Sequence, residues 1–209
     1  MDTLTLTPEG RELSGLLPPP GRHLVGICGP PGAGKSRLAD HVARTYGAVV
    51  VPMDGFHLAD VELARRGLLD RKGTPESFDG WGYAALLARL HARPDHVVMA
   101  PAFERDLEQP IAGSIPVSPD AGLVVTEGSY LLLDDDPWLA VRARLDAVWY
   151  VRTDDRLRQR RLITRHVTFG KSPEEAQAWV ERVDEANAAL VEAAHQRADL
   201  LLDLTRWRG

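Results

Sequence analysis

Eight residues, from Gly29 to Ser36, constrain the fold of this chain more than any other stretch. They read Gly-Pro-Pro-Gly-Ala-Gly-Lys-Ser and fit the pattern G-x-x-x-x-G-K-S/T, whose glycines let several backbone N–H groups point at one anion. The preceding run, residues 23–28, is apolar like a buried strand, and residues 36–46 carry a helical stripe. Strand, loop and helix in this order predict a nucleoside-triphosphate site, because the helix directs its positive end toward the phosphates.

The residues of this loop have separate expected tasks. Lys35 would reach the β- and γ-phosphates of ATP, and the Ser36 hydroxyl would ligate Mg²⁺. Backbone N–H groups of the loop and of the first helical turn would surround the remaining phosphate oxygens. The expected ATP-binding residues are therefore Gly29, Pro30, Pro31, Gly32, Ala33, Gly34, Lys35, Ser36 and Arg37.

A second Gly-Lys-Ser, residues 170–172, does not predict a second phosphate site. The pattern would need a glycine where the chain has Arg165. The run Ser172-Pro173-Glu174-Glu175 is instead typical of a helix start, with Ser172 as the N-cap and Glu175 closing a capping box. A long amphipathic helix is expected over residues 173–194, and its apolar face carries Asn187, the only asparagine of the chain.

Strand-like and helix-like segments alternate along the chain. Apolar or β-branched runs suggest strands at residues 23–28, 48–53, 96–100, 123–127, 146–151 and 200–204. The pattern predicts an α/β fold of the P-loop NTPase type, with a doubly wound, mostly parallel five-stranded sheet flanked by helices. Residues 107–121, which contain three prolines, are expected to form a small antiparallel excursion. Residues 1–21 would be an N-terminal extension, and residues 22–209 a single domain with a lid at about residues 154–171.

Composition limits the class of protein. The chain has 209 residues, 44% of them hydrophobic and 26% charged, which is typical of one globular domain. A net charge of −5 argues against nucleic-acid binding, and the single cysteine, Cys28, excludes an internal disulfide. No apolar run has the length of a membrane helix, and residues 1–13 lack the pattern of a secretory signal. We expect a cytoplasmic monomer or homodimer whose partner is a small molecule, not nucleic acid or a membrane.

Two carboxylates follow predicted strands at the edge where parallel sheets bind ligands. Asp54 comes after the second strand, and phosphoryl transfer to a hydroxyl needs a carboxylate that orients the acceptor and takes its proton. A helix or loop cap is the alternative for Asp54. Glu127 ends the fourth strand, where it would help to hold Mg²⁺ or, alternatively, form an ion pair with a nearby cation.

Five arginines lie within ten residues, namely Arg156, Arg158, Arg160, Arg161 and Arg165. A solvated basic face is the interpretation that we favour for Arg156 and Arg158. The alternative for the others is a mobile lid whose arginines spread the charge of the transition state. Arg161 and Arg165 are four residues apart and would share one face of the helix.

The order and spacing of these motifs resemble the kinase family that contains uridine kinase, phosphoribulokinase and bacterial-type pantothenate kinase. The resemblance covers about residues 22–205 and is strongest to the small members named nucleoside/nucleotide kinase family protein or fructose transport system kinase. Its carriers are Gly-Pro-Pro-Gly-Ala-Gly-Lys-Ser at 29–36, Met-Asp-Gly-Phe-His at 53–57, Arg-Lys-Gly-Thr-Pro-Glu-Ser-Phe-Asp at 71–79, Glu-Gly-Ser-Tyr-Leu-Leu-Leu at 127–133, Arg-Leu-Ile-Thr-Arg-His at 161–166 and Asp-Glu-Ala-Asn-Ala at 184–188.

The resemblance implies a role for each motif. Asp54 would be the general base, and Ser36, Glu127 and Asp54 would surround Mg²⁺. Lys35, Arg161 and Arg165 would act with Asp54 in catalysis. The acceptor pocket or its approach would be lined by His57, Lys72, Asp79, Phe103, Arg105, Tyr130 and Asn187. Capping or packing roles are the alternative for His57, Phe103, Tyr130 and Asn187.

The acceptor is where the chain departs from the family patterns. Uridine kinases have Asp-Ser-Phe-Tyr where this chain has Asp-Gly-Phe-His, and they have Asp-His-Pro where Asp79 is followed by Gly80 and Trp81. Pantothenate kinases share Asp-Gly-Phe but are much longer. The predicted function is a Mg²⁺-dependent ATP kinase for a hydroxyl of a sugar, a pantothenate-like molecule or a similar metabolite. A nucleoside kinase and an ATP-bound regulatory switch without an acceptor are the alternatives.

Overall fold

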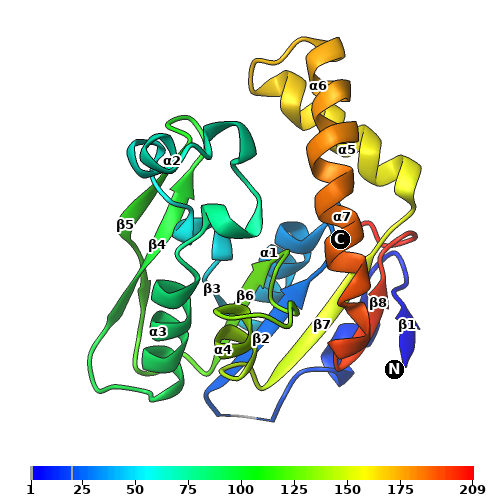
Figure 1. Cartoon of the computed structure of the whole chain (residues 1–209). Coiled ribbons are helices and arrows are strands. Elements are labelled where there is room, and N and C mark those ends of the chain that lie inside the picture. The colour runs from blue at the N-terminus through cyan, green and yellow to red at the C-terminus, as the bar shows by residue number, and fades with distance from the viewer. Residues whose placement is uncertain (1, 20) are drawn as a thin grey trace.

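The computed structural model describes residues 2–19 and 21–209 and has a parallel sheet between two layers of helices (Figure 1). The strand order is β1-β8-β7-β2-β6-β3, and every hydrogen-bonded pair in this sheet is parallel. The strands are β1 (Thr3–Thr5), β2 (His23–Cys28), β3 (Val49–Val50), β6 (Leu123–Gly128), β7 (Ala147–Arg152) and β8 (Leu200–Asp203). The predicted doubly wound α/β fold is confirmed, but this sheet has six strands where five were expected.

Alternate residues of the central strands face the two helical layers. Leu24 of β2 packs in the cluster that includes α3, α4 and α7, whereas Val25 packs in the cluster that includes α1. The described α-helices are α1 (Lys35–Tyr46), α2 (Asp60–Arg66), α3 (Gly80–His91), α4 (Trp138–Arg142), α5 (Asp155–Thr168), α6 (Pro173–Trp179) and α7 (Glu185–Ala193). In the described part of the chain, no helix is long and apolar enough to cross a membrane.

The predicted third strand lies outside the central sheet, which corrects the sequence interpretation. Residues 98–104 form β4 (Val98–Glu104), which pairs only with the antiparallel β5 (Gln109–Val117). Val98 and Ala100 are buried while Met99 between them is exposed, so this strand is covered on one face. A central parallel strand is covered on both faces, which explains why β4 stands apart. The antiparallel excursion expected within residues 107–121 is confirmed as β5.

The sixth strand comes from the N-terminal residues. β1 pairs with β8, and Leu6 and Leu13 are buried with Trp207 in the cluster around α1. The sequence Thr-Leu-Thr of β1 has one apolar residue, so it carries too little periodicity to be recognised as a strand. A strand this short can be assigned only from its pairing with a neighbouring strand, and the sequence does not identify that neighbour.

Helices α5, α6 and α7 form an arm that extends beyond the sheet (Figure 1). The expected capping box at Ser172 and Glu175 is confirmed at the start of α6. The predicted continuous helix over residues 173–194 is interrupted by a π-helical segment, Val180–Asp184, between α6 and α7. Single π-helical turns inside α-helices are frequent at functional sites, and the buried side chains of Asp184, at the end of this segment, and Asn187 line the cleft described below.

Candidate active site

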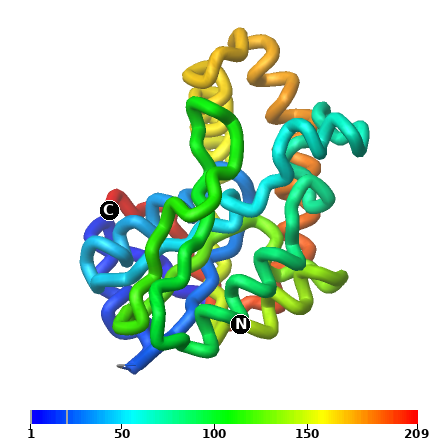
Figure 2. The backbone as a smooth tube through the Cα atoms, turned by 90° about the vertical axis from the view of Figure 1, so that its left-hand side faces the viewer, coloured from blue at the N-terminus to red at the C-terminus, as the bar shows by residue number. Residues whose placement is uncertain are grey.

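A cleft of about 600 Å³ opens at the carboxyl ends of β2 and β6. One wall is formed by the turn after β3, the loop of residues 69–78 and the tip of the β4–β5 hairpin. The opposite wall is the arm of α5, α6 and α7. The phosphate loop lies on the floor, and Figure 2 shows from the side how the hairpin and α2 on one hand and the arm on the other rise above the sheet.

The phosphate loop has the shape that the glycines predict. Gly34 adopts φ 103° at the start of α1, a conformation that side chains rarely permit. A Cβ on Gly32 would stand 2.9 Å from the carbonyl oxygen of Arg158 on α5, so the loop and the arm approach closely. The loop therefore needs glycine both for its backbone angles and for its contact with the arm.

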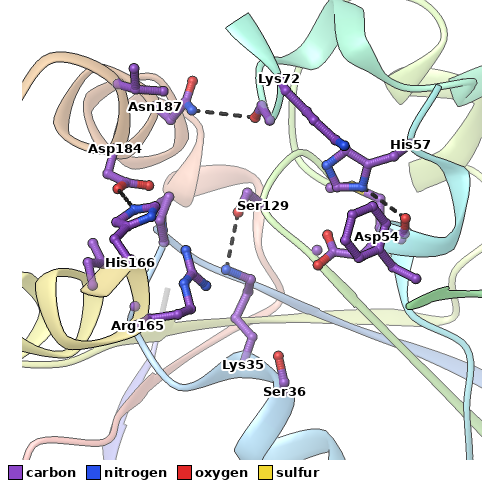
Figure 3. Close-up of a pocket in the computed structure, with 18 of the residues that line it drawn as sticks. Lys35, Ser36, Asp54, His57, Lys72, Ser129, Arg165, His166, Asp184 and Asn187 are labelled. Carbon is purple, nitrogen blue, oxygen red and sulfur yellow. Dashed lines mark hydrogen bonds and ion pairs between the residues drawn. The ribbon is translucent and has the colours of Figure 1, made fainter. Parts of the chain in front are cut away.

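Lys35 points into the cleft from the first turn of α1 (Figure 3). Its Nζ donates to the carbonyl oxygens of Gly29 and Pro30, at 2.9 and 3.2 Å, and to Ser129 Oγ at 3.1 Å. Burial lowers the pKa of the Lys35 ammonium, and the nearby carboxylate of Glu127 opposes this. The partly buried ammonium forms no ion pair with a carboxylate among the described residues, which suits it to a phosphate ligand.

Ser36 and Glu127 meet on the floor beside Lys35. The Ser36 hydroxyl donates to Glu127 Oε1 at 3.0 Å, and Glu127 is buried at the end of β6. Burial raises the pKa of the Glu127 carboxyl, and the negative charge of Asp54 raises it further. A hydroxyl and a buried carboxylate are oxygen donors that fit Mg²⁺, which in phosphotransferases takes few protein ligands and completes its shell with water and phosphate. In the described residues, no cluster of three or more His, Cys, Asp or Glu forms a closed metal cage.

Glu127→Gln should stabilise the ligand-free protein. Because its pKa is raised, the ionised carboxylate costs free energy at pH values above that pKa and nothing below the unfolded-state value, where both states are protonated. We expect the melting temperature of the variant to rise by roughly 2–4 °C near neutral pH, corresponding to about 1 kcal/mol, and the gain to disappear near pH 4. Thermal unfolding without nucleotide measures this, and a lower melting temperature at neutral pH would contradict it.

Asp54 lies on the wall opposite the arm, in a 3₁₀ turn, Met53–Phe56, directly after β3. Its Oδ2 accepts a hydrogen bond from Arg105 Nη2 at 2.7 Å. The Asp54 side chain is 29% exposed, so solvent and ligands reach it. The structure places it in the same cleft as Lys35, Ser36 and Glu127, as the sequence predicts.

His57 lies beside Asp54 (Figure 3) and packs against two aromatic rings. Its ring centroid lies 4.0 Å from that of Phe78 and 4.7 Å from that of Phe103. Nδ1 lies 2.9 Å from the carbonyl oxygen of Asp54, which can only accept, so Nδ1 carries the proton. Burial lowers the pKa of His57, so at neutral pH the ring is uncharged and its Nε2 is an acceptor for a hydroxyl.

Two residues expected in the acceptor pocket hold the loop of residues 69–78. The hydroxyl of Tyr130 donates to the carbonyl oxygen of Gly73, and Asn187 Nδ2 contacts the same oxygen at 3.4 Å. Lys72 Nζ donates to Asp60 Oδ1 at 2.7 Å and to the carbonyl oxygen of Glu108 at 2.5 Å. The structure thus brings His57, Lys72, Phe103, Arg105, Tyr130 and Asn187 together in the cleft.

Asp79 is the exception among the predicted pocket residues. Its side chain accepts from the backbone N–H of Gly82 at 2.8 Å and caps the N-terminus of α3. It does not line the cleft. An aspartate before a helix, as in the run Ser-Phe-Asp-Gly, is typical of an N-cap. Asp79 was instead assigned to the pocket because it ends the motif at residues 71–79.

The arm supplies the predicted arginines. Arg161 and Arg165 both line the cleft from α5. The next residue, His166, is bound through Nε2 to Asp184 Oδ2 at 2.8 Å, and both side chains are largely buried (Figure 3). His166, Asp184 and Ser129 had no predicted role, although the motifs at 161–166, 184–188 and 127–133 contain them. Their positions within those motifs could have indicated that these residues belong to the site.

Arg158 is not part of a solvated face, which corrects the sequence interpretation. Its side chain is 3% exposed, and Nη2 binds both carboxylate oxygens of Glu185, at 2.8 and 3.0 Å. Asp155 and the carbonyl oxygen of Pro31 are further partners, at 3.3 and 3.4 Å. The arginine therefore joins α5 to α7 and to the phosphate loop. Arg156 is exposed, as expected.

Arg158→Met should destabilise the protein, whereas Arg156→Met should not. Removing the buried guanidinium leaves Glu185, whose side chain is 33% exposed, without its cation, which costs about 2–4 kcal/mol, toward the lower end of the range for buried ion pairs. An exposed arginine with no such pair contributes within about 0.5 kcal/mol. Urea unfolding of the two variants measures the difference. Equal midpoints would show that the pair to Glu185 does not hold the arm.

Comparisons with known proteins agree with this geometry. No protein-family model matches the chain. The ATP-dependent kinase-like protein notR' of Aspergillus versicolor is 35% identical over 133 residues, which cover 60% of this chain and 77% of that protein. The crystal structure of a candidate fructose transport system kinase from Silicibacter sp. TM1040 has a TM-score of 0.81 and 37% identity, covering 91% of this chain and 95% of that one. The chain belongs to the P-loop kinases.

Relatives of this kinase carry different functional names. A candidate uridine kinase of Schizosaccharomyces pombe is 29% identical over 187 residues, covering 83% of this chain and 80% of that protein. The resemblance found in the sequence is therefore confirmed, and the protein is a phosphotransferase. One of these names mentions uridine and the other mentions fructose transport, so family membership alone does not identify the acceptor of this chain.

Proposed function

We propose that this P-loop kinase transfers the γ-phosphoryl group of Mg-ATP to a hydroxyl group of a small metabolite such as a sugar or a pantothenate-like alcohol. The observation that carries the proposal is one cleft in which the phosphate loop faces a partly exposed Asp54 across a floor that holds Ser36 and Glu127. A nucleotide switch needs the loop and the metal ligands but has no use for a carboxylate on the opposite wall.

Each residue has one task in this reaction. Asp54 takes the proton of the acceptor hydroxyl as that oxygen forms a bond to the γ-phosphorus and the bond from phosphorus to the bridging oxygen of ADP breaks. Lys35 and the loop N–H groups hold the phosphates in line. Ser36 and Glu127 would hold Mg²⁺, which neutralises phosphate charge when bound.

The arm and a neighbouring hollow complete the ATP site in this proposal. Arg161 and Arg165 face the phosphate loop and stabilise the charge that develops on the transferred group. The adenine would lie in an adjacent hollow lined by Arg37, Thr205, Arg206 and Trp207. The guanidinium of the exposed Arg37 lies 5.5 Å from the ring centroid of the buried Trp207, and we expect the base to stack on this guanidinium.

An ADP-release screen tests the proposal. The purified protein would be incubated with Mg-ATP and nucleosides, sugars, sugar alcohols or pantothenate, each compared with ATP alone. We expect ADP release to rise at least about tenfold with one class of alcohol, because a kinase hydrolyses ATP only slowly in the absence of its acceptor. Slow release that is equal with and without every alcohol would instead support a nucleotide switch.

A further inference from the structure

Arg105 forms an ion pair with Asp54, the residue that the proposed reaction needs as a base. Its Nη2 lies 2.7 Å from Asp54 Oδ2, so this carboxylate oxygen is bound to a guanidinium in the absence of an acceptor. A carboxylate that already accepts a charge-assisted hydrogen bond is less available to take a proton from a hydroxyl. Arg105 must therefore leave or share Asp54 when an acceptor arrives.

Arg105 is placed so that it can change partners. It follows the last residue of β4, at the hairpin tip, and its side chain is 45% exposed. The guanidinium lies 5.1 Å from the ring centroid of Phe103. This cation–π contact attracts the guanidinium without a hydrogen bond, so Arg105 can still turn toward another anion. A guanidinium has five N–H donors in a fork that matches a carboxylate or phosphate, and Asp54 uses only one of them.

Lysines mark the same region of the cleft. The chain has three lysines, Lys35, Lys72 and Lys171, and all three line this cleft. Lys72 Nζ lies 5.5 Å from the same Phe103 ring as Arg105, so the two cations flank one surface. Lys171 extends from the arm over Trp179, 4.5 Å from its ring centroid, and no carboxylate of the described residues forms an ion pair with it.

Most acidic groups on this side already have a partner. Asp60 pairs with Lys72 at 2.7 Å and Asp184 is bound to His166, whereas Lys171 forms no ion pair among the described residues. Glu108 reaches Lys72 through its backbone carbonyl. Besides Asp54, the other carboxylates that line the cleft are Glu108 and Glu127, and Glu127 accepts a hydrogen bond from Ser36.

We propose that the phosphorylated alcohol carries an anionic group, a carboxylate or a phosphate, and that Arg105 exchanges Asp54 for this group when the acceptor binds. This inference rests on the proposed kinase function. Lys72 and, from the arm, Lys171 add to the binding of the anion. The exchange frees Asp54 only when the correct acceptor is present, so the empty enzyme does not use Asp54 to activate water against ATP.

The first test needs no acceptor. Arg105→Gln removes the guanidinium from Asp54, and we expect its ATP hydrolysis in the absence of any alcohol to exceed that of the wild type at least about threefold. The double variant with Asp54→Asn should return to the wild-type level, which shows that the gain acts through Asp54. Arg65→Gln, which removes an exposed arginine paired with Glu62 on α2, is the matched control and should not change hydrolysis. Unchanged or lower hydrolysis by Arg105→Gln would overturn the exchange.

The second test compares alcohols that differ in charge. Glycerol, glycerate and glycerol 3-phosphate form one set, glucitol, gluconate and glucitol 6-phosphate a second, and pantothenol and pantothenate a pair. We expect the anionic members to have at least about tenfold higher kcat/KM than their neutral partner, and the preferred anion to distinguish a carboxylate from a phosphate. Arg105→Gln should reduce this ratio.

Preference for the neutral member, or a ratio that Arg105→Gln leaves unchanged, would overturn the assignment of an anionic acceptor. These outcomes are distinct from failure of the kinase function. If ATP binds and no alcohol of any charge is phosphorylated, the proposed function fails. The hydrolysis rates of Arg105→Gln still decide whether the guanidinium restrains Asp54.

Discussion

Asp54→Asn should lower kcat by about 10²–10⁴-fold while the affinity for Mg-ATP stays within about twofold of the wild type. The asparagine keeps the shape of the side chain and can still accept from Arg105, but it cannot take a proton from the acceptor hydroxyl. Asp54 lies on the wall opposite the arm and forms no hydrogen bond with the phosphate loop among the described residues, so ATP binding does not depend on it.

Turnover with a phosphorylated alcohol and binding of a fluorescent ATP analogue measure the two quantities separately. Asp95→Asn is the matched control, because Asp95 is fully exposed and lies outside the cleft. Turnover within a few-fold of the wild type for Asp54→Asn would remove Asp54 from the role of base. Equal loss of ATP binding and turnover would place Asp54 among the residues that organise the nucleotide.

Lys35→Ala should lower kcat/KM for ATP by at least about 10³-fold. The ammonium bridges Gly29, Pro30 and Ser129, and it is the cation on the cleft floor that the phosphate loop itself supplies. Its removal takes away both the charge that binds the phosphates and a support for the loop. In contrast to Asp54→Asn, this variant should lose ATP affinity as well as turnover.

Arg44→Ala is the control for Lys35→Ala, since Arg44 is an exposed cation in the last turn of the same helix. The measurement combines steady-state kinetics with the thermal shift produced by Mg-ATP. We expect Arg44→Ala to show the full shift and Lys35→Ala to show none. A wild-type thermal shift in Lys35→Ala would mean that the loop N–H groups bind the phosphates without the ammonium.

The parts of the fold that the sequence predicts are those with strong local patterns. The loop from Gly29 to Ser36 and the capping box at Ser172 are defined by residue type and spacing, and both were predicted correctly. The strand at 96–100 was recognised as a strand but placed in the wrong sheet, because pairing depends on which face of the strand is covered. β1 was missed because its three residues carry no periodicity.

In the site, too, local sequence patterns predicted some residues, whereas contacts between distant segments were not predicted. Asp54 and Glu127 could be placed in one cleft because both follow strands whose carboxyl ends share an edge. The burial of Arg158 against Glu185 was not predictable, because the two residues are distant in sequence and the surrounding arginines look alike. The ion pair between Arg105 and Asp54 likewise joins a hairpin tip to a strand end, and only the folded chain brings them together.

Transfer of labelled phosphate to an alcohol is the most direct test of the account. The protein would be mixed with ATP labelled at the γ-phosphate, Mg²⁺ and the alcohol that releases most ADP, and the labelled products would be separated after a single turnover. We expect one labelled organic phosphate per ADP for the wild type and almost none for Asp54→Asn. Label found only as inorganic phosphate, at a rate that no alcohol changes, would contradict the proposed transfer to a hydroxyl.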